Sequence, residues 1–81
     1  MTNREKLREL LLDVFLLEPD EFSFELKRGE IETWDSLGVV SMAVGVEEAF
    51  GYHCTPAEAT GISSVADIIA LLETKGIPFD E

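Results

Sequence analysis

The stretch SLGVVSMAVGVEEAF, residues 36 to 50, constrains the fold more than any other part of the chain. On a helical wheel of about 100° per residue, one arc of this stretch has the spacing of a core-facing apolar stripe. The opposite arc is also apolar in part, and it ends in two glutamates. The core-facing arc holds Val39, Met42, Ala43, Val46 and Phe50, and the opposite arc holds Leu37, Val40, Ser41, Val44, Glu47 and Glu48.

A chain of 81 residues is too short to bury both faces of such a helix. We expect a single domain over residues 1–81, and a domain of this size buries only about 60% of its unfolded surface. The second apolar face is therefore expected to stay exposed. Isolated surface apolar residues are common and carry no meaning by themselves. An apolar cluster bordered by carboxylates, however, is typical of a surface that docks other proteins.

The N-terminal segment is expected to form the first helix. Thr2 to Glu5 have the spacing of a capping box, and five apolar residues follow at helical intervals: Leu7, Leu10, Leu11, Val14 and Phe15. Pro19 marks the limit of this helix. Residues 19–34 are predicted to form a long loop packed by its own apolar side chains, which are Phe22, Phe24, Leu26, Ile31 and Trp34.

Two further helices are expected near the C-terminus. Thr55-Pro56-Ala57-Glu58 combines a capping box with proline at the first helical position, and Gly61 should end this helix after about a turn and a half. Ser63 or Ser64 should cap the last helix, with Val65, Ile68, Ile69 and Leu72 inward and Gly76 as its C-cap. The predicted fold is all-α, a four-helix bundle with three longer helices and a short third one, and with a long loop between helices 1 and 2.

The charge is strongly acidic and unevenly distributed. Seventeen acidic residues stand against six basic ones, which gives a formal net charge of −11. No lysine or arginine occurs between Gly29 and Thr74. Such a surface repels nucleic acid and anionic lipid and attracts basic protein surfaces, so we expect no nucleic-acid partner.

Several other functions find little support in the residues. Cys54 is the only cysteine and cannot form an internal disulfide, and it aligns with a core position; His53 is expected on the surface. No calcium loop, zinc spacing or phosphate loop occurs, so neither a metal site nor a catalytic site is predicted. The charged N-terminus and the absence of a run of about 20 apolar residues favour a soluble, cytoplasmic protein without a membrane span, which we expect to be a monomer.

Asp35-Ser36-Leu37 opens the central helix, and Glu47-Glu48-Ala49-Phe50-Gly51 closes it. In this arrangement and in domain length the chain resembles the acyl carrier protein family. The resemblance implies that Ser36 carries 4′-phosphopantetheine, transferred from coenzyme A by a phosphopantetheinyl transferase. The thiol of that arm would hold acyl groups as thioesters. The protein would then be a carrier and not an enzyme.

The resemblance also assigns roles to neighbouring residues. Asp35 would contact the transferase, although capping of the helix is an adequate alternative. The remaining partner-binding positions would face an acyl-loading ligase or acyltransferase and downstream enzymes with basic docking surfaces. They are the apolar Leu37, Val40 and Val44, the acidic Glu47 and Glu48, and Ser41.

Two positions depart from the pattern of carriers in bacterial fatty acid synthesis. Gly38 and Ser41 stand where those carriers usually have acids, and with Gly45 they form a row of small residues. We expect this row to admit a closely packed partner or an acyl chain, and we expect a specialised lipid, polyketide or surface polysaccharide pathway. An aminoacyl or peptidyl carrier stays possible. So does an unmodified helical interaction domain, in which Ser36 is only the N-cap of its helix.

Overall fold

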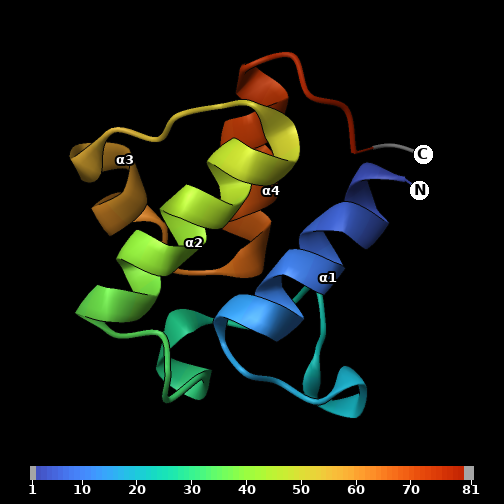
Figure 1. Ribbon diagram of the computed structural model, residues 1–81, viewed down its shortest axis with the longest axis vertical. Coiled ribbons are helices and arrows are strands. Elements are labelled where there is room, and N and C mark those ends of the chain that lie inside the picture. Colours follow the sequence, from blue (N-terminus) through green and yellow to red (C-terminus); the bar gives the residue numbers. More distant parts are fainter. Residues whose placement is uncertain (1, 80–81) are drawn as a thin grey trace.

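The computed structural model describes residues 2–79, and these form four α-helices (Figure 1). They are α1 (Asn3–Val14), α2 (Ser36–Phe50), α3 (Pro56–Gly61) and α4 (Val65–Thr74). Between α1 and α2 the long loop contains two 3₁₀ turns, Pro19–Glu21 and Arg28–Glu30. No strand occurs in residues 2–79; an isolated bridge pairs Lys27 with Ser64. The predicted all-α fold with a short third helix is confirmed.

The helices begin where their capping side chains lie. Thr2 and Thr55 each form a complete capping box with a glutamate three residues later, as predicted. Of the two candidate serines before α4, Ser64 is the cap, and its side chain accepts a hydrogen bond from the N–H of Asp67. At the other end of α4, Lys75 is the C-cap and Gly76 follows in a left-handed conformation with φ 85°. The predicted C-cap is therefore wrong by one position: the cap is Lys75, and Gly76 is the residue after it.

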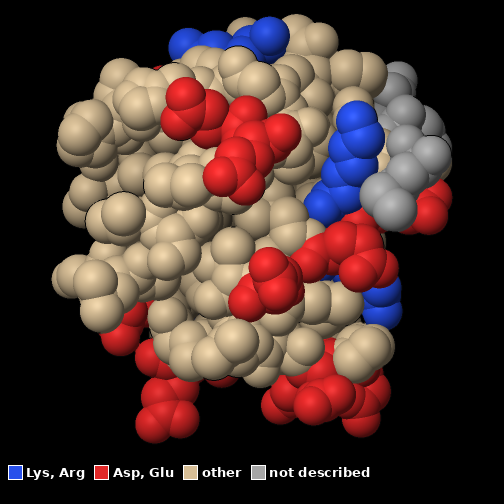
Figure 2. Space-filling view, viewed as in Figure 1, with Lys and Arg blue, Asp and Glu red and all other residues tan. Residues whose placement is uncertain are grey.

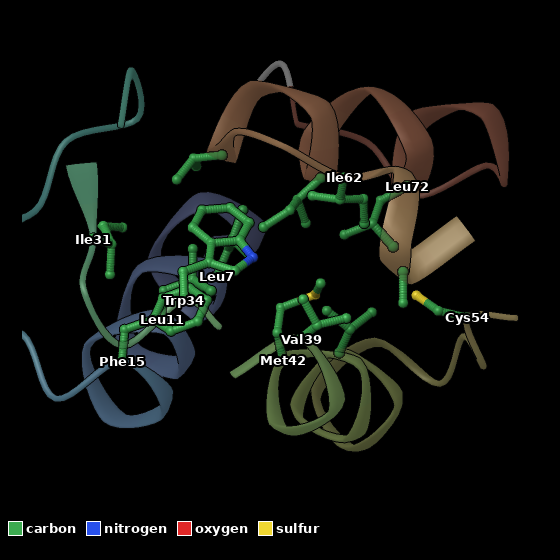
Figure 3. Close-up of a cluster of buried hydrophobic side chains, with 14 of the residues drawn as sticks. Leu7, Leu11, Phe15, Ile31, Trp34, Val39, Met42, Cys54, Ile62 and Leu72 are labelled. Atoms are coloured by element: carbon green, nitrogen blue, oxygen red, sulfur yellow. The ribbon is translucent and has the colours of Figure 1, made fainter. Parts of the chain in front are cut away.

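The four helices and the loop enclose one apolar core. In Figure 1, α4 lies behind α2, and α1 lies beside α2. Phe15 at the end of α1 stacks on Trp34 of the loop, with ring centroids 4.8 Å apart (Figure 3). The indole N–H of Trp34 has no acceptor in residues 2–79, so stacking and burial hold the ring. The buried side chains of the core include Leu7, Leu11, Val39, Met42, Val46, Cys54, Ala59, Ile62, Val65, Ile68, Leu72 and Phe79.

The long loop is tied to the rest of the protein at several points, and these ties place the start of α2. The hydroxyl of Thr33 donates to the carbonyl of Phe15 over 2.7 Å. The N–H of Arg28 donates to Ser63 over 2.8 Å, and the N–H of Val65 donates back to Leu26 over 2.9 Å. Because both ends of the loop are bonded to helices or their connections, the segment before Ser36 is held in a defined position.

Candidate functional site

Ser36 is the first residue of α2, and Asp35 before it is the N-cap. The Asp35 carboxylate accepts a hydrogen bond from the N–H of Gly38 over 2.9 Å. Ser36 is exposed, and its hydroxyl has no hydrogen-bond partner in the part of the chain that the structure describes. Asp35 therefore performs the capping. The interpretation of Ser36 as an N-cap is wrong, and its hydroxyl is free to react.

The N-terminus of α2 suits an anion bound to Ser36. Helix N-termini carry unsatisfied N–H groups and a partial positive charge, which together favour negative groups. Asp35 satisfies the N–H of Gly38, whereas the N–H groups of Ser36 and Leu37 have no acceptor in residues 2–79. A phosphodiester on the Ser36 hydroxyl would lie beside these donors. The residues present thus fit a phosphopantetheine arm.

An apolar groove starts at Ser36 and runs between α2 and α3. Its volume is about 360 Å³, at the low end of the range of roughly 300–1,000 Å³ for small-molecule pockets. His53 and Glu47 also line the groove, and the His53 Nδ1 lies 3.1 Å from a Glu47 carboxylate oxygen. The apolar lining consists of Val39, Val40, Ala43, Val44, Cys54 and Ala59.

Cys54 contributes its thiol to this groove as a small apolar group. It is buried, as predicted from its core position. Burial raises the pKa of the Cys54 thiol, and the negative charges of Glu58 and Glu47 raise it further. Because the thiolate is the reactive form, a raised pKa makes Cys54 a poor nucleophile.

A polar cluster of three side chains fixes α3, which forms one wall of the groove. The Tyr52 hydroxyl donates to a Glu58 carboxylate oxygen, and Lys75 lies 3.8 Å from the other oxygen. This hydrogen bond is the main cause that raises the pKa of Tyr52 to about 12 and lowers the pKa of Glu58. The ammonium group of Lys75 also lies 5.6 Å from the centre of the Tyr52 ring. The cluster connects the α2–α3 loop, α3 and the end of α4.

The second face of α2 is exposed. Leu37 is 78% exposed, Val40 60% and Val44 50%. Ser41, Glu47 and Glu48 are exposed as well. In Figure 2, a broad surface without charged side chains covers much of the region of α2 and α3, and carboxylates gather over the C-terminal half of α2. The structure thus places all the predicted docking residues at the surface, while their binding role stays a prediction.

The two glutamates of α2 lie on different sides of its exposed apolar residues, which are Leu37, Val40 and Val44. Glu47 lines the groove between α2 and α3 and pairs with His53. Glu48 lines a second hollow between α1 and α2, which also contains Asp13, Ser41 and Val44. A partner that covers Val44 would therefore meet the Glu47 carboxylate on one side of this valine and the Glu48 carboxylate on the other.

The row of small residues has a different explanation from the expected one. A Cβ on Gly38 would lie 2.2 Å from the carbonyl oxygen of Thr33, and a Cβ on Gly45 would lie 2.4 Å from the Cδ1 of Leu10. Gly38 is buried under the loop, and Gly45 packs against α1. These two glycines serve packing within the chain, so the expectation that they admit a partner or an acyl chain is wrong. Of the three positions only Ser41 is exposed.

Sequence reasoning missed Arg28 as a member of the site. This residue lies in the loop, eight positions before Ser36, and it lines the same groove as Ser36. Arg28 lies outside the α-helices, so no helical periodicity in the sequence could indicate its neighbours.

Other kinds of site find no geometric basis in the described residues. Within residues 2–79, no three histidine, cysteine or acidic side chains are grouped closely enough to hold a metal ion. No helix in that range has both the length and the apolar composition needed to cross a membrane.

Fold and site together define a class: a small acidic α-helical protein with a free serine at a helix N-terminus beside an apolar groove. Comparison with known proteins agrees. The chain is 33% identical over 69 residues to an acyl carrier protein of Akkermansia muciniphila, an alignment that covers 85% of this chain and 86% of the relative. The chain belongs to the acyl carrier protein family.

Further relatives support the same assignment. An acyl carrier protein of Campylobacter hominis is 29% identical over 85% of this chain and 87% of its own length. One of Coprothermobacter proteolyticus is 27% identical over 86% of this chain and 85% of its own length. No family model matches the chain. Membership in this family agrees with the expectation of a carrier that has no catalytic activity of its own.

Proposed function

We propose that the protein carries acyl intermediates as thioesters on a 4′-phosphopantetheine arm attached to Ser36. The observation that carries this proposal is the exposed hydroxyl of Ser36 at the first position of α2, which has no hydrogen-bond partner among residues 2–79. The arm supplies a terminal thiol when it is attached. The protein supplies the attachment point, helix N–H groups beside the phosphodiester and an apolar groove that starts at the same residue.

The proposed attachment needs only the Ser36 hydroxyl from this chain. That oxygen attacks the phosphorus of coenzyme A that bears the pantetheine, and a new P–O bond forms. The P–O bond to the nucleotide breaks, so 3′,5′-ADP leaves, and the serine proton passes to a base of the transferase. Asp35 is occupied in capping α2 through Gly38, so it holds the helix start that presents Ser36.

The proposed partners follow from the exposed face of α2. A phosphopantetheinyl transferase, an acyl-loading ligase or acyltransferase and downstream enzymes would dock on Leu37, Val40 and Val44 through an apolar contact. Basic residues at the rim of such enzymes would meet Glu47 and Glu48, which suits a chain with a net charge of −11. We place this activity in the cytoplasm, in a monomer that forms a single carrier domain.

The proposal extends to a specialised pathway, and this extension now rests on Ser41. Position 38 has no acidic residue because no side chain fits there, so the missing charge at this position carries no information about partners. Ser41 is exposed beside Val40 and could bear a carboxylate without a clash, which makes its lack of charge a property of the docking surface.

Intact mass spectrometry tests the proposal directly. The protein is co-expressed with a broad-specificity phosphopantetheinyl transferase, and we expect a mass gain of one phosphopantetheine. Ser36→Ala should show no gain. An unmodified wild-type protein would contradict the proposal and favour an interaction domain. Loading of the holo protein with amino acids in preference to acyl groups would favour an aminoacyl carrier.

A further inference from the structure

We propose that Arg28 is a positioning residue that binds the phosphodiester on Ser36 and directs the arm along the groove between α2 and α3. The inference rests on the proposed attachment at Ser36. It concerns a loop residue that lies eight positions away from the serine in sequence and lines the same groove.

The backbone of Arg28 is held in place on both sides. Its N–H donates to Ser63 over 2.8 Å, and its carbonyl accepts from the N–H of Ile31 over 3.1 Å. Arg28 is also the first residue of the 3₁₀ turn Arg28–Glu30. The side chain therefore starts from a fixed point between the α3–α4 connection and the segment that leads into α2.

The guanidinium group is held beside the start of α2. Its Nε donates to the carbonyl oxygen of Trp34 over 3.0 Å, and Trp34 lies two residues before Ser36. Within residues 2–79 this bond uses one of the five N–H donors of the group, and the other donors can bind a second acceptor. Held in this way, the guanidinium loses little conformational freedom when it binds a phosphate.

Within residues 2–79 Arg28 has no carboxylate partner, although the protein is rich in carboxylates. Among residues 2–79 the basic side chains within ion-pair distance of a carboxylate are those of Arg8, His53 and Lys75, and Arg28 is not one of them. Arg28 is also the only lysine or arginine among the residues that line this groove. An arginine held in place without an acidic partner has its charge available for another anion.

A phosphodiester at Ser36 would be stabilised by such a cation. A phosphodiester there adds a negative charge to a chain with a net charge of −11, directly after the carboxylate of Asp35. The N–H groups of Ser36 and Leu37 offset part of the repulsion. Arginine binds phosphate oxygens through paired, charge-assisted hydrogen bonds, which are stronger than bonds between neutral groups. Contact with Arg28 would restrain the arm at its base and point it into the groove.

The test compares the holo forms of wild type, Arg28→Gln and Lys27→Gln. Lys27 is the matched control, because it is the adjacent residue, is exposed, carries the same charge and does not line the groove. Intact mass first establishes that all three proteins carry the arm. The phosphorus NMR signal of the phosphodiester is then recorded as the salt concentration rises.

We expect Arg28→Gln to shift the phosphorus signal away from its wild-type position and to remove most of its salt dependence. Lys27→Gln should leave both unchanged. A second measurement needs no variant: the Nε–H signal of Arg28 in the wild-type protein should move between the apo and holo forms. In Ser36→Ala treated with the transferase it should not move.

The outcomes separate this inference from the function on which it rests. If the wild-type protein gains no mass, the proposed function fails and the inference fails with it. If all three proteins gain the arm but share one phosphorus signal, and the Arg28 Nε–H signal is the same in apo and holo protein, only the inference is overturned. Equal shifts in Arg28→Gln and Lys27→Gln would also overturn it, since they would show an effect of net charge alone.

Discussion

The carbonyl oxygen of Thr33 lies so close to Gly38 that a Cβ on that glycine would be only 2.2 Å from it. The contact joins the loop before Ser36 to the first turn of α2. Phe15 also lies near, with its Cε1 3.3 Å from the same Cβ position. The start of α2 is therefore packed under the loop, and the position of Ser36 depends on that contact.

We predict that Gly38→Ala destabilises the protein, whereas Gly45→Ala has little effect. At Gly38 the clash is with backbone, which cannot move away cheaply, and overpacking of this kind costs about 1–3 kcal/mol. At Gly45 the clashing atom is the end of the Leu10 side chain, which can rotate away at a lower cost. The helix propensity that alanine gains, about 1 kcal/mol, offsets that cost. Chemical denaturation of both variants measures the difference. Equal free energies of unfolding for the two variants would contradict the packing argument.

Charged and apolar residues of the docking face should affect different rate constants of partner binding. Glu47→Lys with Glu48→Lys reverses two rim charges, each worth only about 0–1 kcal/mol in an exposed pair, and should slow association with the transferase. Val44→Ala truncates a half-exposed apolar residue and should raise the dissociation rate, at a cost that can exceed about 1 kcal/mol. Surface plasmon resonance at several salt concentrations measures both rates. Asp20→Lys with Glu21→Lys, in the first 3₁₀ turn, is the charge-matched control. Unchanged kinetics in every variant, with the fold intact, would place docking elsewhere.

A substitution at Ser41 tests the proposal of a specialised pathway. If its lack of charge weakens engagement with basic enzymes of fatty acid elongation, Ser41→Glu should make the holo protein a better substrate for a housekeeping malonyl transferase and condensing enzyme. Initial rates of both proteins in a reconstituted assay give the answer. A wild-type protein that already supports elongation as fast as a housekeeping carrier would refute the specialised pathway and leave the role of Ser36 intact.

The cluster of Tyr52, Glu58 and Lys75 should make the folded protein less stable in acid. The folded protein lowers the pKa of Glu58 below its ordinary value of 4.5, mainly through the hydrogen bond from Tyr52. The unfolded chain therefore binds more protons in this range, and the stability that Glu58 contributes above its unfolded pKa is lost as the pH falls through the folded pKa. Thermal unfolding between about pH 5 and pH 3 should thus show a smaller loss for Glu58→Gln than for wild type. Glu73→Gln removes an exposed carboxylate of α4 and should keep the wild-type slope. Identical slopes for all three proteins would rule out this role of Glu58.

Much of the fold could be predicted from local signals. Capping residues and apolar spacing located α1, α2, α3 and α4, because a helix is specified by residues within a few positions of one another. The same local signals placed Ser36 at the start of α2. They also indicated that Leu37, Val40 and Val44 are exposed, opposite the core-facing stripe. The separate roles of Asp35 as cap and Ser36 as first helical residue needed the backbone conformation, since either residue type can cap a helix.

What the sequence by itself determined, then, is which segments are helical, which serine opens the central helix and that one face of this helix exceeds what the core can bury. The tertiary structure alone decided that Gly38 and Gly45 face Thr33 and Leu10, that Arg28 lies beside the start of α2 and that Tyr52, Glu58 and Lys75 meet. The physical reason is that these contacts join different elements of the fold, whether the residues are close in sequence, as Gly38 and Thr33 are, or far apart, as Gly45 and Leu10 are, and so depend on how the loop and the helices pack. Helical periodicity reports only which face of its own segment a residue occupies.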